Sequence, residues 1–523
     1  MTKRTLFSRA LFCNNSHTRP NILTASQLFL PLLAGFLFVL QPALGQETKE
    51  IKLLNADVMK FDRSLGNDVK KLIGAVDLEL DGAFLNCDSA YLFQRDSVEA
   101  FGHVYIKQGD TLHLYGDYLN YSANTKLAQL RKNVKLIDKE SELTTNSLDF
   151  NLDENLGYYP SFGRIVSGEN ILTSNKGLYY TKSKVFHFQD SVVVVNPDYT
   201  IYSDTMKYHT VTKVTTFFGP TEIIGDSSYI YCEKGYYDTE NDLSRFSGNA
   251  LLKNQSQTIE GDSLFYDSRN GIGEAYRNVS FFDSLQNIIL KGNLGFFQDE
   301  PETTMLTDST MFIQILEEGD SLFMHSDTLR SRMDSTGQNK IVSAYYHVKM
   351  FSRDLQGLCD SLAYSFADSV MKFYGTPYIW SDENQLSSEF TQLFTKNRQP
   401  NRIEMFGSSF IISKEDTAYF NQIKGKNMVG HFRDNEIYRI DVSGNGQSIY
   451  FASDEGKIVG MNKAESSDIV LYLRENKIEQ IKFLNQPDML LIPKNEISTG
   501  NLRLEGFQWK ERERPLKMAD IFK

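Results

Sequence analysis

The stretch Gly116–Ile137 reads GDYLNYSANTKLAQLRKNVKLI, and its pattern decides the fold. Leu119 and Tyr121 share one parity, and Val134 and Leu136 repeat that alternation after a turn-rich segment. Apolar residues that alternate with polar ones, among many β-branched and aromatic side chains, are typical of β-strands. The stretch therefore predicts two strands of about 10–12 residues joined by a tight turn.

Copies of this stretch recur along the chain at a fixed spacing. Each copy can be anchored on one acidic or amide residue ahead of the alternating triplet. The anchors that follow one another at intervals of 29 residues are Asp88, Asp117, Asn146, Asn175, Asp204, Glu233 and Asp262. Looser copies extend the series from Asp57 to Ser388. A period of this length predicts a repeat architecture in which each unit supplies two strands.

A two-strand unit cannot bury its own apolar face, so neighbouring units must stack to form one continuous core. Gly or Asn in mid-strand, as at Gly102 and Asn133, suits a bend. We expect each anchor beside the bend, where Asp and Asn side chains satisfy backbone donors. Bent strands stacked in register predict an antiparallel, all-β trough or flattened tube with an apolar lining.

The composition excludes several classes of protein. The chain has 523 residues, of which 41% are hydrophobic and 12% aromatic, so it can bury a large core. Its 67 acidic and 55 basic residues give a net charge of −12, which argues against nucleic acid as a partner. A mean hydropathy of −0.37 excludes a polytopic helical membrane protein.

The N-terminus has the layout of a secretory signal peptide. Residues 28–40 form an apolar run behind basic residues, shorter than the ~20 residues that span a bilayer. Small residues follow at 43–45, so we expect residues 1–45 to be a signal peptide cleaved before Gln46. An uncleaved anchor is the alternative.

The rest of the chain divides by how regular the repeat is. We expect regular repeats over residues 46–300, more divergent repeats over 301–492 and a charged C-terminal tail over 493–523. Three cysteines directly precede anchors or their equivalents in different repeats, which sets them beyond the ~7 Å reach of a disulfide. These residues, read as packing positions, are Cys87, Cys232 and Cys359.

The paired pattern A-D-x-L-x-Y … G-N-V-x-L resembles the OstA/LptA family, which includes the N-terminal domain of LptD. Ala56–Phe61, Gly248–Ala250 and Asn278–Val279 carry it, and the resemblance covers residues 51–300 well and 301–490 loosely. It implies a β-taco, or open β-jellyroll, of stacked 29-residue two-strand repeats. The implied function is a periplasmic bridge that binds lipopolysaccharide and shields its lipid A acyl chains in the trough. The chain departs from the family in being longer than a typical LptA, and we expect no outer-membrane barrel domain, such as a full LptD has, in the residues after the repeats.

The resemblance also implies partners and a location. The partners are lipopolysaccharide and other Lpt-type envelope proteins joined by edge-strand addition, with peripheral contact to membranes. The expected location is the periplasm, in association with inner- and outer-membrane complexes.

The apolar residues of one parity are the candidates for the trough lining, because acyl chains need a groove that excludes water. These lipid-binding candidates are Leu119, Tyr121, Val134, Leu136, Leu148, Phe150, Tyr179, Met206, Tyr208, Leu264, Tyr266, Val279 and Phe281. The same residues would equally fill a closed core. A ligand-free structural or adhesive β-solenoid of the cell envelope is therefore the alternative.

Motifs for catalysis or metal binding are incomplete. Gly261–Leu264 and Gly319–Leu322 spell the GDSL tag of hydrolases, but the first is one copy of the β repeat, and Asp110–His113 precedes both. Asp238–Asp242 opens like a calcium loop without its Gly and Glu, and no zinc-ligand spacing occurs. The Asp residues fall one per repeat, whereas a glycosidase needs paired carboxylates ~5–9.5 Å apart. We predict no enzyme activity, no cofactor and no metal site.

Overall fold

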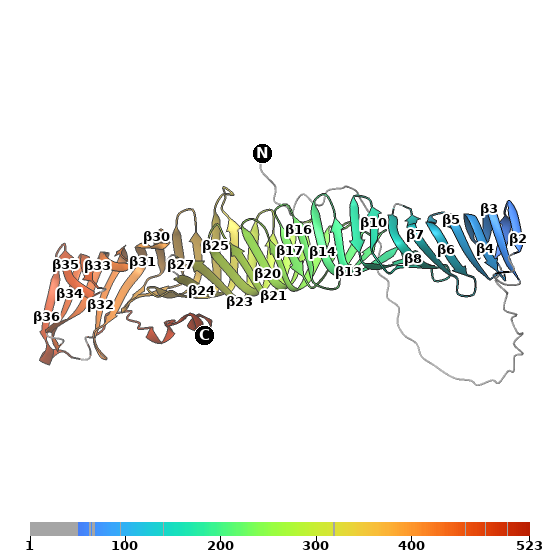
Figure 1. Ribbon diagram of the computed structural model, residues 1–523. Coiled ribbons are helices and arrows are strands. Elements are labelled where there is room, and N and C mark those ends of the chain that lie inside the picture. The colour runs from blue at the N-terminus through green and yellow to red at the C-terminus, as the bar shows by residue number, and fades with distance from the viewer. Residues whose placement is uncertain are drawn as a thin grey trace, which may run out of the picture. The chain divides into compact units, whose positions relative to one another are not determined.

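The computed structural model describes residues 51–61, 64, 68–94, 96–139, 141–316, 320–454, 457–475, 477–498, 500 and 502–523. The expected signal peptide, residues 1–45, lies outside the described residues. The described chain is built of antiparallel strands with short 3-10 turns near its C-terminus, and those ranges contain no α-helix (Figure 1). None of their helices has the length and apolarity to cross a membrane. The prediction of an all-β repeat fold is confirmed.

The chain forms two compact units, the first made of residues up to 227 with 233–243, and the second of 228–232 with 244–523. The strands of the first unit are β1 (Lys52–Asn55), β2 (Val58–Phe61), β3 (Val69–Leu80), β4 (Ala83–Phe93), β5 (Ser97–Gln108), β6 (Leu112–Ser122), β7 (Leu127–Asp138), β8 (Ser141–Asn151), β9 (Leu156–Tyr159), β10 (Gly163–Ser167), β11 (Asn170–Ser174), β12 (Lys176–Tyr180), β13 (Val185–Val195), β14 (Tyr199–His209), β15 (Val214–Phe217), β16 (Thr221–Gly225) and β18 (Lys234–Asp238).

The elements of the second unit are β17 (Tyr229–Cys232), β19 (Leu243–Lys253), β20 (Gln257–Asp267), β21 (Ile272–Asp283), β22 (Ile288–Gln298), β23 (Thr303–Ile315), β24 (Ser321–Met333), β25 (Lys340–Phe351), β26 (Gln356–Ser365), β27 (Val370–Tyr374), β28 (Tyr378–Ser381), β29 (Asn384–Ser387), β30 (Phe390–Lys396), β31 (Gln399–Lys414), β32 (Phe420–Arg433), β33 (Glu436–Asp454), β34 (Lys457–Arg474), β35 (Lys477–Leu484), β36 (Asp488–Pro493), η3 (Lys494–Glu496), η5 (Glu511–Glu513) and η6 (Met518–Phe522).

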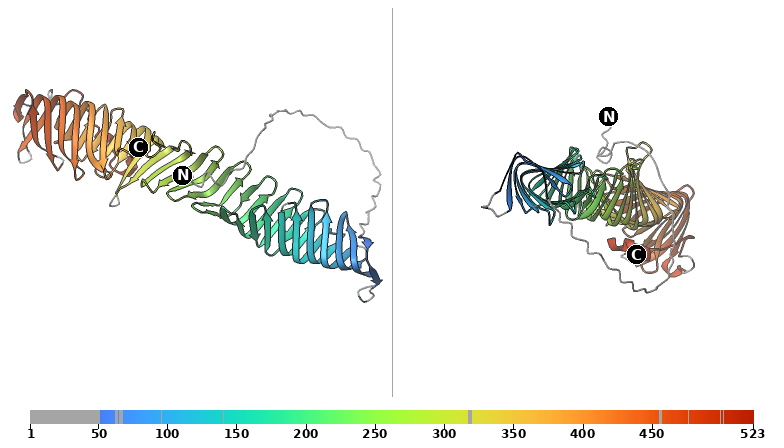
Figure 2. Two further views of the ribbon diagram at one scale, coloured as in Figure 1. Left: turned by 90° about the horizontal axis from the view of Figure 1, so that it is seen from above. Right: turned by 90° about the vertical axis from the view of Figure 1, so that its right-hand side faces the viewer.

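Within each unit the strands lie side by side, each hydrogen-bonded to the strands before and after it (Figure 2). Where a strand is interrupted, its two halves continue the stack: β10 pairs with the first half of β8, and β9 pairs with the second half. The two-strand repeat of the sequence is therefore a repeat of antiparallel neighbours.

Alternate long strands bend in the middle at a pair of residues with positive φ. In β5 these are Gly102 at φ 71° and His103 at φ 42°, and the pairing with β6 skips both, from Phe101 to Val104. Two successive left-handed residues turn the strand sharply, which sets its two halves at an angle. We call such a pair a corner.

In several repeats the anchor residue of the preceding strand contacts the corner. Asp88 Oδ2 lies 2.8 Å from His103 Nδ1, and a Cβ added to Gly102 would lie 2.2 Å from the same oxygen. Asn133 Nδ2 likewise donates to Asp117 Oδ2 at 2.7 Å. In these repeats the anchor bonds a side chain of the corner rather than the backbone donor that the sequence suggested.

The fixed period also has a cause in the turns. Leu152 N donates to the carbonyl of Lys126 at 3.0 Å, Thr181 N to Asn155 at 3.0 Å and Thr210 N to Lys184 at 2.9 Å. Each turn thus hydrogen-bonds the equivalent turn of the next repeat. An inserted residue would break this ladder, so the spacing stays at 29 residues.

Bending brings the two ends of the strands towards each other as two rows of turns. In unit 1 the first row follows β3, β5, β7, β10 and β13, and the second row follows β4, β6, β8, β12 and β14. We call the line between the rows the seam. The apolar interior lies behind it, enclosed by the two halves of the bent strands.

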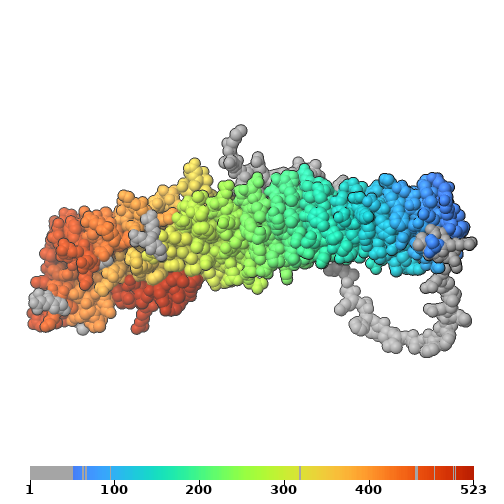
Figure 3. Space-filling model, in the orientation of Figure 1, coloured from blue at the N-terminus to red at the C-terminus, as the bar shows by residue number. Residues whose placement is uncertain are grey.

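The residues after β36 fold back onto unit 2, where Figure 3 shows them in dark red against the yellow and orange strands. Leu504 is buried on an outward-facing apolar cluster that includes Phe420 and Phe451. The side-chain amide of Gln422 bonds the backbone of this segment twice. Its Nε2 donates to Leu502 O at 2.8 Å, and its Oε1 accepts from Leu504 N at 2.9 Å. The charged tail of the sequence therefore covers a second apolar core.

Candidate functional site: the interior and its seam

The predicted lining residues lie on the interior face of the bent strands. Leu119 and Tyr121 in β6 and Leu148 and Phe150 in β8 are fully buried, while their neighbours in sequence are not. The other candidates are also buried, except Tyr266, which is half-buried. The parity read from the sequence thus selects one face. Burial alone suits an acyl-chain lining and a plain core equally, so the lipid-binding role stays a prediction.

Ion pairs across the seam close the interior of unit 1. Lys126 in the second row lies 2.7 Å from Asp81 in the first row and 2.7 Å from Asp153 in its own row. Gln108 Nε2 donates across the seam to Leu152 O at 3.2 Å. These contacts join residues about one and a half repeats apart, which shows that the rows meet with a lengthwise offset.

The next closure is a buried group of three residues. Asp138, at the end of β7, has a side chain only 1% exposed, and its Oδ2 lies 2.5 Å from Lys184 Nζ. The hydroxyl of Tyr179 donates to the same carboxylate oxygen at 2.6 Å. Burial, together with the adjacent carboxylate, raises the pKa of Tyr179 well above its ordinary value, so the phenol stays protonated.

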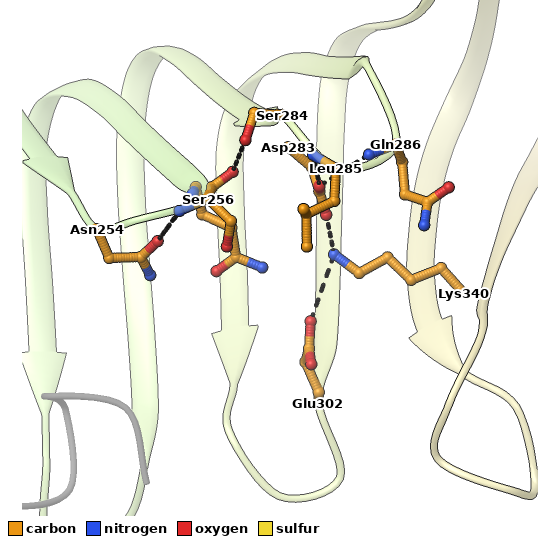
Figure 4. Close-up of polar contacts among 9 residues, drawn as sticks. Asn254, Ser256, Asp283, Ser284, Leu285, Gln286, Glu302 and Lys340 are labelled. Carbon is orange, nitrogen blue, oxygen red and sulfur yellow. Dashed lines mark hydrogen bonds and ion pairs between the residues drawn. The ribbon is translucent and has the colours of Figure 1, made fainter. Parts of the chain in front are cut away.

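Unit 2 has a closure of the same kind. Figure 4 shows the Lys340 ammonium between the carboxylates of Asp283 and Glu302, and it lies 3.5 Å from Glu302. Asp283 also accepts from the backbone of its own turn, from Leu285 N at 3.0 Å and Gln286 N at 3.2 Å. The carboxylate therefore fixes the turn and receives the lysine from the opposite row.

A cavity of about 250 Å³ lies between the two rows of unit 1, with Gly168 of the first row and Lys213 of the second row in its lining. Its floor is apolar and includes two predicted lining residues, Met206 and Tyr208. Its full lining is Ser167, Gly168, Glu169, Asn170, Leu172, Val194, Asn196, Tyr199, Ile201, Met206, Tyr208, Lys213, Thr215 and Thr239. An apolar floor under a polar rim is the arrangement that binds amphiphilic ligands.

The rim could not be read from the sequence as part of a site. Lys213 and Glu169 lie in turns, where charged residues are ordinary. The signal that could have found Lys213 is its spacing, because Lys184 and Lys213 occupy one position in successive repeats, at φ 59° and 56°. Tyr199, on the floor, was also missed, and burial raises its pKa to about 12.

The three interior cysteines do not have the depressed thiol pKa of a nucleophile. Burial raises the pKa of each of the three interior thiols to about 12, so Cys87, Cys232 and Cys359 are neutral, and all three are free. Among the described residues no cluster of three His, Cys, Asp or Glu side chains could hold a metal ion.

Part of the chain is similar to a known protein family and to a solved structure. The family described as OstA-like protein matches residues 48–204. Among solved structures, LptH of Pseudomonas aeruginosa, described as the LptA-homologous periplasmic component of the conserved lipopolysaccharide transport device, is 18% identical. The match covers 21% of this chain and 82% of that one, with a TM-score of 0.19. No relative was found among curated proteins. OstA-like proteins are non-enzymatic, which agrees with the prediction that the chain is not an enzyme, and the predicted resemblance to the OstA/LptA family is confirmed for residues 48–204, which match an OstA-like domain.

Proposed function

We propose that the protein is a periplasmic carrier that binds lipopolysaccharide and shields its lipid A acyl chains in the apolar interior on the way to the outer membrane. The observation that carries this proposal is the cavity at Met206 and Tyr208, where the seam opens onto the interior face. Apolar chains gain about 25 cal/mol for each Å² removed from water, and the interior face of the strands in unit 1 is lined with buried apolar side chains. The match of residues 48–204 to the OstA-like family supports the same conclusion.

The two ends of the stack support partner binding by strand addition. β1 and β2 pair only with β3 among the described strands, and they expose Leu54, Met59 and Phe61. β35 and β36 pair only with β34 in the same described set, and they expose Leu490 and Leu491. Unpaired strand edges with apolar side chains are suited to accept a strand of another protein. We propose Lpt-type envelope proteins as these partners.

Photo-crosslinking in cells tests the carrier function. A photo-reactive residue at Tyr121 or Tyr208 faces the interior, and one at Asn120 or Lys207 is its outward neighbour. We expect glycolipid adducts at the interior positions and none at their neighbours. Equal labelling of both, or no glycolipid at either, contradicts the proposal.

One observation favours the second candidate, a ligand-free β-solenoid of the envelope. The interior around Tyr121 and Phe150 is packed to zero exposure, which leaves no space for a chain unless the seam opens. A covalent bridge between the two rows distinguishes the candidates. Lys126→Cys and Asp81→Cys joined by a short bis-maleimide would lock a carrier in its closed form and abolish the adducts at Tyr121, whereas a solenoid forms no adducts with or without the cross-link.

A further inference from the structure

The closure formed by Asp138, Tyr179 and Lys184 recurs one repeat later with one member changed. Advancing each residue by 29 positions leads to Ser167, Tyr208 and Lys213. The tyrosine and the lysine are kept, but the carboxylate is replaced by a serine. All three residues line the cavity at the seam.

The Lys213 ammonium and the Tyr208 hydroxyl have no carboxylate as a common partner, because Ser167 stands in its place. In the complete closure, one carboxylate oxygen receives both Lys184, at 2.5 Å, and the Tyr179 hydroxyl, at 2.6 Å. In the described part of the chain, neither the Lys213 ammonium nor the Tyr208 hydroxyl has an ion pair or hydrogen bond. Among the described residues, the Ser167 hydroxyl has one hydrogen-bond partner, the hydroxyl of Ser141, which donates to it at 3.3 Å.

The space that the carboxylate vacates is the mouth of the cavity. Four buried apolar residues contribute to its lining, namely Leu172, Val194, Ile201 and Met206. A volume of about 250 Å³ exceeds the ~150 Å³ of an engineered cavity that admits benzene, so it holds one chain end and no bulkier group. An anion at the mouth would thus be covalently continuous with an apolar chain below it.

We propose that Lys213 and Tyr208 bind the anionic head of a single-chain amphiphile, a phosphate or a carboxylate, whose chain enters the interior at this point of the seam. The inference rests on the proposed carrier function and names the place where a chain is first admitted. The head group takes the position that the Asp138 carboxylate holds one repeat earlier. Charge-assisted bonds from Lys213 and the phenol replace the two bonds of the complete closure.

The rim defines the rest of the head group. Glu169 and the amides of Asn170 and Asn196 also line the mouth, and Asn196 Nδ2 donates to Asn170 Oδ1 at 2.8 Å. The carboxylate of Glu169 disfavours a second negative charge and favours a hydroxyl or amine donor. A phosphate that carries a sugar fits this rim better than a bare phosphate.

Titration calorimetry of the full chain with dodecyl phosphate and with dodecanoate, both below their micelle concentrations, tests the site. Dodecyl maltoside has the same chain without the charge, and inorganic phosphate has the charge without the chain. We expect both anionic amphiphiles to bind at one site and both controls to bind at least tenfold more weakly, because dodecyl maltoside lacks the charge that Lys213 and Tyr208 bind and inorganic phosphate lacks the apolar chain. If only one anionic amphiphile binds, that result identifies the head group as a phosphate or a carboxylate.

Three variants locate the binding. Lys213→Met should weaken dodecyl phosphate about tenfold, and Tyr208→Phe about threefold. Ser167→Asp restores the sequence of the preceding closure, so it should fold, pair with Lys213 and abolish binding. Lys182→Met, an exposed lysine in the equivalent turn of the preceding repeat, is the matched control and should leave affinity unchanged.

Unchanged affinity in both Lys213→Met and Ser167→Asp overturns the inference, as does a parent chain that binds dodecyl maltoside as tightly as dodecyl phosphate. These outcomes are independent of the carrier function. Glycolipid adducts at Tyr121 together with unchanged affinity in the variants would keep the carrier and reject this entry point.

Discussion

The buried closure at Asp138 makes a quantitative prediction for Lys184→Met. The substitution keeps the length of the side chain but leaves a carboxylate that is 1% exposed with Tyr179 as its remaining partner. Breaking a buried ion pair from one side costs about 3–5 kcal/mol. The Lys184 side chain is 23% exposed, so water recovers part of the loss, and we expect about 3 kcal/mol.

Hydrogen exchange read by mass spectrometry is the appropriate measurement. The tryptophans, Trp380 and Trp509, both lie in unit 2, so fluorescence does not report on unit 1. A loss of 3 kcal/mol corresponds to exchange about 150-fold faster for amides that exchange through opening of the seam, in β7 and β12. Lys182→Met, two residues earlier in the same turn, should change exchange by less than about threefold, as surface substitutions do.

A second variant separates loss of the pair from loss of packing. Asp138→Asn combined with Lys184→Met removes the buried charge and keeps an acceptor for Tyr179, so we expect most of the protection to return. If Lys184→Met exchanges no faster than Lys182→Met, or if the double variant is the less protected of the two, the seam is not held by this closure.

Three further outcomes follow from the corner and from the C-terminal segment. The hydrogen bond to Asp88 raises the pKa of His103. This corner contact therefore stabilises the fold at pH values below the pKa of His103 in the unfolded chain, and the stabilisation is lost as the pH rises through its pKa in the folded chain. NMR titration of Asp88→Asn should show a lower pKa for His103 than in the parent chain. Gly102→Ala should destabilise unit 1 by about 2 kcal/mol in exchange, because positive φ and the carboxylate of Asp88 both oppose a Cβ. Gln422→Ala should release the segment around Trp509, seen as a red-shifted emission and faster tryptic cleavage.

Each of these outcomes has a control within the chain. Burial lowers the pKa of His187, so its titration should stay below that of His103 and should not respond to Asp88→Asn. Gly82 has φ 85° with no atom within 4 Å of an added Cβ, so Gly82→Ala isolates the backbone cost of about 1 kcal/mol. Gln447→Ala removes a half-buried glutamine whose Nε2 donates to Glu465, away from Trp509, and unchanged emission is expected for this variant. An equal response in any variant and its control contradicts the corresponding argument.

The sequence could predict what repeats locally. The alternation at Leu119 and Tyr121 gives both the strand and the face that it buries, and the anchors locate the bends. The closure at Asp138 could not be predicted, because its lysine comes 46 residues later and the offset between the rows depends on how the bent strands stack. The apolar layer under Leu504 could not be predicted either. Its residues face outward from the sheet, and the segment that covers them is rich in charged residues, which are typical of a solvent-exposed tail.

The division of the chain into regions could be predicted only in part from the sequence. The structure separates its two units at residues 228–243, where the 29-residue register is still regular, so periodicity carries no sign of that division. The expected limits at residues 300 and 492 remain predictions. The carrier role of the lining residues also remains one, because apolar side chains of one parity satisfy a packed core as well as a ligand.

The bonds from turn to turn constrain how such a chain can evolve. Loss of a single residue would turn every later side chain of that strand inside out, whereas removal of a whole 29-residue unit would restore both the ladder and the facing of the strands. Descendants should therefore differ in size by whole multiples of this unit. A relative with one unit fewer near Ser167 would also lose the register between Lys213 and its neighbours, so gain or loss of a repeat there would relocate the entry point along the molecule.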